Sequence, residues 1–107
     1  MLHEIVFSEL SHEELAGIRP FERRRLIDEI ESELTHEPSA KTRRKKTLKK
    51  EVVAPFEFEP PLRELRVGDF RIFYDVDAEA MRVTVRSVRR KLPDQTTEDI
   101  LNEKGNS

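Results

Sequence analysis

The chain has 107 residues, of which 36% are hydrophobic and 39% are charged, and its formal net charge is −2. This length supports one small core but not two. The absence of cysteine excludes disulfides and thiolate-bound metals, and only three glycines exclude a glycine-rich phosphate loop. No basic region followed by a long apolar run opens the chain, so we expect a cytosolic protein without membrane association.

Residues 2–8, LHEIVFS, alternate between two faces and predict a first strand. Ser11 and Glu14 fit a capping box at the start of a short helix, HEELAGI. Pro20 ends that helix and suits the first turn of the next one. Within residues 20–35, apolar side chains recur at spacings of three and four. We therefore predict an amphipathic helix there, with its apolar stripe on the core.

Residues 36–50 read as a polar, basic connection without a helical stripe. Residues 51–61, EVVAPFEFEPP, read as an edge strand or a loop, because proline cannot complete the hydrogen-bond ladder of a central strand. After Pro93 the sequence becomes polar, with one possible short helical turn. We therefore expect one domain over residues 1–93 and a polar C-terminal tail over residues 94–107.

Between these segments lie three alternating strands, residues 62–67, 70–76 and 81–88, the first two joined by a tight Gly68–Asp69 turn. The complete order is β-α-α-β-β-β. It predicts an α+β fold, in which two N-terminal helices pack on one face of a small antiparallel sheet.

The net charge conceals two basic blocks. Residues 41–50, KTRRKKTLKK, carry +7 and residues 81–91, MRVTVRSVRRK, carry +5, whereas the segments around them are acidic. A polyanion site needs such a local field, since binding depends on neighbouring charges rather than on the total. Solvated surface is the alternative interpretation of either block alone.

The stretch ELRVGDFRIFYDVD, residues 64–77, contains an arginine where a strand does not need one. Alternation places Phe70, Ile72, Tyr74 and Val76 on one face, which suits a core. Arg71 and Phe73 fall on the other face. Arg71 is either a functional group or a half-exposed sheet arginine paired with Glu64 or Asp75.

Three stretches carry a resemblance to a known family: LTHEP (34–38), RRKKTL (43–48), and ELRVGDFRIFYDVD together with VTVRSV. In order and spacing they resemble the RelE/ParE superfamily of toxins from bacterial type II toxin–antitoxin systems, over roughly residues 2–91. The resemblance implies a microbial-RNase-like sheet and neutralisation by an antitoxin protein. RelE-like members cleave mRNA in the ribosomal A site, whereas ParE-like members inhibit DNA gyrase without cutting RNA.

The resemblance also implies roles for individual residues. In RelE-like toxins the arginine after Gly-x-aromatic, here Arg71, contacts the scissile phosphate, where a fixed guanidinium stabilises the phosphorane. A second basic residue follows the last strand, and Arg89, Arg90 or Lys91 matches that position. The usual lysine bases are missing, so Glu64 is the candidate base. A surface ion pair with Arg66 or Arg71 is the alternative for Glu64.

The other candidates are basic residues for phosphates and aromatic residues for stacking or docking. Phe56 and Phe58 could anchor the antitoxin, or else close the sheet edge internally. The candidates for binding RNA or its phosphates are Lys45, Lys46, Arg66, Arg86, Arg89, Arg90 and Phe73. No motif for a metal, a nucleotide or a flavin is present, so we predict no cofactor.

We therefore predict a toxin that cleaves RNA at the ribosome by a metal-independent mechanism and forms a hetero-oligomer with its antitoxin. The C-terminal His or Tyr of many RelE-like enzymes is missing, and the three histidines, His3, His12 and His36, lie toward the N-terminus. Two alternatives consequently stay open: a non-catalytic, ParE-like inhibitor of gyrase, and a degenerate toxin that only binds its antitoxin.

Overall fold

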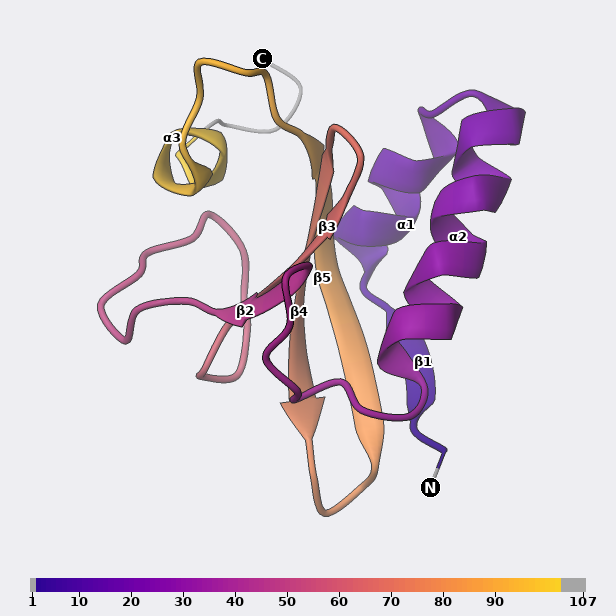
Figure 1. Cartoon of the computed structure of the whole chain (residues 1–107), viewed down its shortest axis with the longest axis vertical. Coiled ribbons are helices and arrows are strands. Elements are labelled where there is room, and N and C mark those ends of the chain that lie inside the picture. The colour runs from indigo at the N-terminus through magenta and orange to yellow at the C-terminus, as the bar shows by residue number, and fades with distance from the viewer. Residues whose placement is uncertain (1, 103–107) are drawn as a thin grey trace.

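The computed structural model of the chain describes residues 2–102. Figure 1 shows the sheet nearly edge-on, with two helices on one side and a third helix on the other. The elements in chain order are β1 (Glu4–Phe7), α1 (Glu9–Ala16), α2 (Pro20–Leu34), β2 (Lys45–Thr47), β3 (Arg63–Val67), β4 (Phe70–Asp77), β5 (Arg82–Arg90) and α3 (Thr97–Leu101).

The five strands form one sheet in the order β1-β5-β4-β3-β2. The predicted α+β architecture, with α1 and α2 on one face, is confirmed. The meander of β3, β4 and β5 is antiparallel, but β1 pairs parallel to β5, so the sheet is mixed. Alternation in a sequence identifies a strand, but it does not identify the partner or the direction of pairing.

β2 lies inside residues 36–50, which were predicted as a polar, basic connection, and that prediction is wrong at Lys45–Thr47. The three residues carry no apolar alternation. They become a strand only because they pair antiparallel with β3, where Lys46 lies opposite Glu64. Tertiary pairing therefore creates this strand.

The start of α1 also differs from the prediction. Ser8 is the N-cap, and its side chain accepts a hydrogen bond from the Ser11 backbone N–H. Ser11 is buried inside the helix, where its hydroxyl donates to the carbonyl of Val85 at 2.9 Å. Glu14 contacts β5 instead of the helix start. The predicted capping box at Ser11 and Glu14 is therefore wrong, because both side chains are used by the sheet.

α2 matches its prediction to within one residue, with Pro20 in its first turn. Leu26, Ile30 and Leu34 are buried against the sheet. Together with the helix-facing strand residues they form the first core: Leu15, Leu26, Ile30, Leu34, Leu65, Val67, Phe70, Ile72, Tyr74, Val83, Val85 and Val88.

A bulge in β5 determines which side chains reach the first core. Phe73 lies opposite Ser87, but the next residue of β4, Tyr74, lies opposite Val85, so Arg86 is an extra residue in β5. An extra residue shifts the alternation by one. Val83, Val85 and Val88 consequently share the helix-facing side, which unbroken alternation does not allow.

The opposite face of the sheet is also covered. Leu62, Phe73, Ile100 and Leu101 form a second core there. Residues 48–58 run across this face with alternate side chains partly buried against it: Leu48, Val52, Ala54, Phe56 and Phe58. We call residues 48–58 and α3 the covering layer.

The C-terminal segment contributes to this layer rather than forming only a polar tail. A capping box at Thr96 and Asp99 begins α3, and Ile100 and Leu101 are fully buried. Two apolar residues in a polar stretch are a weak sequence signal, and only their docking on the sheet shows their role. Within residues 2–102, no helix has the length and apolarity that a membrane span requires.

Candidate functional site on the covered face

Three arginines from adjacent strands lie abreast on the face opposite α1 and α2. Arg66 of β3 is paired with Arg71 of β4, and Arg71 is paired with Arg89 of β5. Residues that lie opposite one another in antiparallel strands point to the same side of the sheet. The sequence prediction selected all three, and the fold brings them together as one row of like charges.

Arg71 occupies the middle of this row and is only 9% exposed. Its guanidinium donates to the carbonyl oxygens of Gly68 and Phe70, each at 2.9 Å. Gly68 has a φ of +55°, which allows the two-residue turn to direct its carbonyl toward the arginine. Burial lowers the pKa of Arg71, and the nearby carboxylate of Glu64 opposes this shift. The hairpin turn thus fixes the guanidinium in place.

Arg89 connects the sheet to the covering layer and is 7% exposed. Its Nε donates to the Ser87 hydroxyl at 2.9 Å, and Nη1 donates to the Ile100 carbonyl of α3 at 2.8 Å. Its guanidinium carbon lies 5.8 Å from the ring centre of Phe56. The Glu14 carboxylate lies 3.7 Å from Nε. Arg89 therefore contributes to attaching both α3 and the 48–58 segment.

Glu64, the candidate base, is buried at 4% exposure beside the same row. Its carboxylate accepts a hydrogen bond from the Thr97 hydroxyl of α3 at 2.9 Å and lies 3.3 Å from the Lys46 ammonium. Phe73, the candidate stacking platform, is fully buried, and its ring centre lies 6.2 Å from that of Phe56. Both residues are thus occupied by contacts within the fold.

The two predicted antitoxin anchors belong to the covering layer. The rings of Phe56 and Phe58 pack edge to face at 6.3 Å, and both are partly buried against the second core. This arrangement matches the alternative interpretation, in which they close the fold internally. Contact between these residues and an antitoxin stays a prediction.

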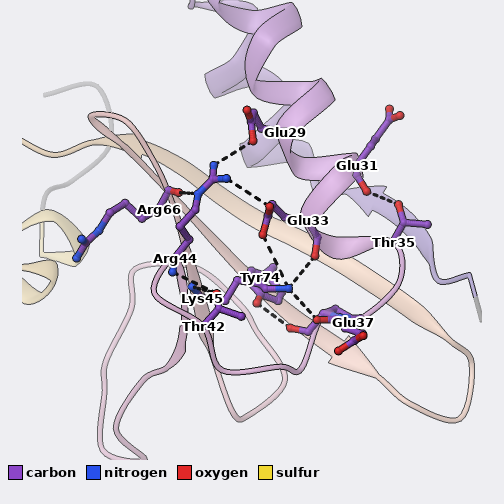
Figure 2. Close-up of polar contacts among 11 residues, drawn as sticks. Glu29, Glu31, Glu33, Thr35, Glu37, Thr42, Arg44, Lys45, Arg66 and Tyr74 are labelled. Atoms are coloured by element: carbon purple, nitrogen blue, oxygen red, sulfur yellow. Dashed lines mark hydrogen bonds and ion pairs between the residues drawn. The ribbon is translucent and has the colours of Figure 1, made fainter.

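Part of the first basic block stabilises the end of α2 (Figure 2). The buried Lys45 ammonium donates to the backbone carbonyls of Glu33 and Glu37, at 3.0 Å and 2.9 Å. Arg44 forms ion pairs with Glu29 and Glu33. Cations are favourable at a helix C-terminus, where backbone carbonyls lack intrahelical donors. The fold therefore uses Lys45 to hold the end of α2. RNA binding would require its ammonium on the surface, whereas this ammonium is buried.

The cations of the second basic block are distributed over different surroundings. Arg86 donates to the buried Asp75 carboxylate at 2.7 Å. Arg90 lies over the ring of Phe70, a first-core residue, 4.4 Å from its centre, and within 4 Å of Glu22 and Asp69. Arg89 and Arg90 therefore do not share a site. Lys91 follows β5, and its backbone N–H donates to the carbonyl of Asp69.

Glu14 and Ser87 form a polar cluster that the sequence prediction missed. β1 pairs with β5 only as far as Val85, so the N–H of Val88 needs another acceptor. The Glu14 carboxylate accepts from this N–H at 2.8 Å and from the Ser87 hydroxyl at 2.9 Å. Burial raises the pKa of Glu14, although these hydrogen bonds oppose the shift. Glu14 and Ser87 are more than seventy positions apart in the chain, so no local sequence pattern predicts their contact.

This shift predicts a pH effect on stability. Because the pKa of Glu14 is raised above its usual value of 4.5, the folded chain keeps a proton that the unfolded chain has already lost. The free energy of unfolding therefore falls as pH rises through the window between the usual and the raised pKa. Glu14→Gln keeps an acceptor but cannot ionise, so it should gain stability relative to wild type as pH rises from about 4 to about 7.

Urea unfolding of both proteins at several pH values measures this difference. Glu79→Gln, at an exposed position in the turn between β4 and β5, is the matched control for removing one carboxylate. The prediction would be contradicted if the difference in unfolding free energy between wild type and Glu14→Gln did not change with pH.

Two solved structures share this fold. The RelBE2 toxin–antitoxin complex from Mycobacterium tuberculosis matches with a TM-score of 0.69 and 20% sequence identity, over 85% of this chain and 93% of that chain. The archaeal RelE–RelB complex from Pyrococcus horikoshii matches with a TM-score of 0.65 and 16% identity, over 87% of this chain and 99% of that chain. At these identities the likeness shows a common fold.

No individual curated protein matches the sequence. Residues 5–92 match the sequence profile described as the ParE toxin of the type II toxin–antitoxin system, parDE. The matched region contains α1, α2 and all five strands apart from the first residue of β1, whereas α3 lies beyond it. Because the profile matches well over half of the chain, this chain belongs to the ParE toxin family of type II toxin–antitoxin systems.

Proposed function

We propose that this toxin arrests growth by binding a protein target, in the manner of the ParE-like inhibitors of DNA gyrase, and that it does not cut RNA. The observation that carries this proposal is the covering layer. Arg71 and Arg89, the arginines that would hold a scissile phosphate, are 9% and 7% exposed on the sheet face that carries this layer, and Arg89 donates to the Ile100 carbonyl of α3. RNA would have to displace α3 and residues 48–58 to reach them.

Displacing the layer is costly compared with the stability of a small domain. Leu62, Phe73, Ile100 and Leu101 would all become exposed. At about 1.5–3 kcal/mol for each buried apolar side chain, this loss is roughly 6–12 kcal/mol as an upper estimate. A domain of this size is stabilised by only about 5–15 kcal/mol in total. We therefore propose that the toxin acts while the covering layer stays packed on the sheet.

The positions of the groups that could transfer protons also argue against RNA cleavage. RNA cleavage by 2′-OH attack needs a general base and a general acid near the phosphate. Glu64, the carboxylate beside the arginine row, is held by Thr97 and Lys46. The three histidines lie elsewhere: His3 precedes β1, His12 is in α1 and His36 follows α2. α1 and α2 lie on the other side of the sheet from Arg71, and the backbone N–H of His3 donates to the Thr35 carbonyl at the end of α2.

We further propose that a cognate antitoxin binds and neutralises this chain in the cytoplasm. The two solved structures described above are a RelBE2 toxin–antitoxin complex and an archaeal RelE–RelB complex. The interface would include surfaces outside the covering layer, since Phe56 and Phe58 are already packed within it.

One observation favours RNA cleavage as the second candidate. Arg66, Arg71 and Arg89 lie opposite one another in adjacent strands, on one face of the sheet. Charge of this density suits a phosphate backbone. This candidate requires the covering layer to open on the ribosome.

Two assays with the same purified toxin separate the candidates. We expect inhibition of DNA supercoiling by gyrase, and no new mRNA 5′ ends in a ribosome-dependent translation reaction. Arg66→Gln removes the exposed member of the row, and Arg43→Gln removes an exposed arginine outside it. Under the proposal, both variants still arrest growth. New 5′ ends that disappear in Arg66→Gln but persist in Arg43→Gln would overturn it in favour of RNA cleavage.

A further inference from the structure

The outward face of α2 carries a stripe of exposed side chains that the toxin fold does not use. Phe21, Arg24, Arg25, Asp28 and Ser32 recur at helical spacing, on the side opposite the buried residues of the helix. Together with Glu29 they line a shallow hollow of about 440 Å³. Phe21 is 82% exposed, more than any other large hydrophobic side chain within residues 2–102.

The exposed charges of α2 are segregated by sign along the helix. Arg24 and Arg25 lie in its N-terminal half, and Asp28, Glu29 and Glu31 lie in its C-terminal half. Arg24 and Arg25 have no ion-pair partner in the part of the chain that the structure describes. The exposed face of α2 therefore presents a positive half and a negative half.

We infer that a second copy of this chain docks on the stripe, with the two α2 helices antiparallel. A two-fold axis perpendicular to the helices sets the N-terminal half of each copy against the C-terminal half of the other. Arg24 and Arg25 of each copy then face Asp28 and Glu31 of its partner, whereas Glu29 keeps its ion pair with Arg44. In this register Phe21 lies beside the small side chain of Ser32 on the other copy, which leaves room for the ring.

The same charge order argues against other occupants. A nucleic-acid backbone is attracted by Arg24 and Arg25 but repelled by the adjoining Asp28 and Glu31. A uniformly acidic protein segment meets the same repulsion at the C-terminal half. Self-complementarity is the property that a symmetric interface requires, and this stripe has it.

The proposed contact between the two copies is small, so the dimer should be weak. The stripe spans about three helical turns, so the area buried per copy is well below the roughly 800 Å² of a standard interface. Exposed ion pairs contribute little individually and are screened by salt. We therefore expect a weak dimer, half formed at about 100 μM and weakened several-fold by high salt. The dimer does not depend on which cellular target the toxin inhibits.

Sedimentation velocity of the full-length toxin, made by cell-free synthesis, tests the inference. The expected result is a concentration-dependent dimer at low salt that dissociates at high salt. Arg24→Glu/Arg25→Glu should be monomeric, and so should Asp28→Lys/Glu31→Lys. An equimolar mixture of these two variants should dimerise again, because each presents the charges that the other needs. Lys49→Glu/Lys50→Glu, at exposed positions outside α2, is the matched control and should dimerise like wild type.

Three outcomes would overturn the inference. The first is a wild-type toxin that stays monomeric throughout the concentration range at low salt. The second is a dimer that both α2 variants still form. The third is a mixture of the two variants that stays monomeric. If a poly-glutamate peptide binds wild type but not Arg24→Glu/Arg25→Glu, and the toxin stays monomeric, the surface belongs to an acidic protein segment instead.

Discussion

Replacing Phe73 by alanine is expected to lower the free energy of unfolding by about 3–5 kcal/mol, a large part of the stability of a small domain. The Phe73 side chain is fully buried at the centre of the second core. Its removal takes a partner from the ring of Phe56 and leaves a cavity between the sheet and the covering layer. Urea unfolding followed by far-UV circular dichroism measures the loss.

Phe21→Ala is the matched control, because the same ring is removed from a site that is 82% exposed. Its unfolding free energy should change by no more than about 0.5 kcal/mol. The Phe73 variant should also be cut faster by protease within residues 48–58, since the contact that holds this segment is lost. If both variants have equal stability, the covering layer does not contribute to the folded state as the structure indicates.

Replacing Lys45 by methionine is expected to cost about 2–4 kcal/mol of stability. Methionine has a similar length but cannot donate a hydrogen bond. The carbonyls of Glu33 and Glu37 would lose their ammonium donor, and the Glu33 carboxylate would lose a cation 4.0 Å away (Figure 2). The C-terminal end of α2 should fray as a result.

Lys50→Met makes the same chemical change at an exposed position of the same basic block. It should alter the unfolding free energy by no more than about 0.5 kcal/mol. Hydrogen exchange of the amides near Leu34 reports the fraying directly. Equal protection of these amides in wild type and in Lys45→Met would show that Lys45 does not hold the end of the helix.

The sequence by itself determined the elements that rest on local chemistry. α2 was predicted to within one residue, because Pro20 marks its start and the apolar residues repeat at helical spacing. The hairpin of β3 and β4 was predicted because Gly68 supplies the positive φ that the turn needs between two alternating runs. The α+β architecture then followed from the order of the elements.

The sequence placed one member of the arginine row, Arg71, on its sheet face. Alternation put Arg71 and Phe73 together, away from the first core. It left Arg89, Arg90 and Lys91 as alternatives, because the bulge at Arg86 shifts the alternation of β5 by one residue. A bulge is set by the pairing of two strands and has no reliable signal in either strand alone.

Only the tertiary structure decided whether the candidate site is open. The second core joins Phe56, Phe73 and Ile100, which are far apart in the chain and lie in three segments of different character. Lys45 and Glu14 likewise took structural roles through partners that no sequence spacing reveals. A basic or acidic residue looks the same in the sequence whether its side chain faces solvent or an unpaired backbone group. Its role depends on which distant backbone groups lack a partner, and long-range packing alone determines that.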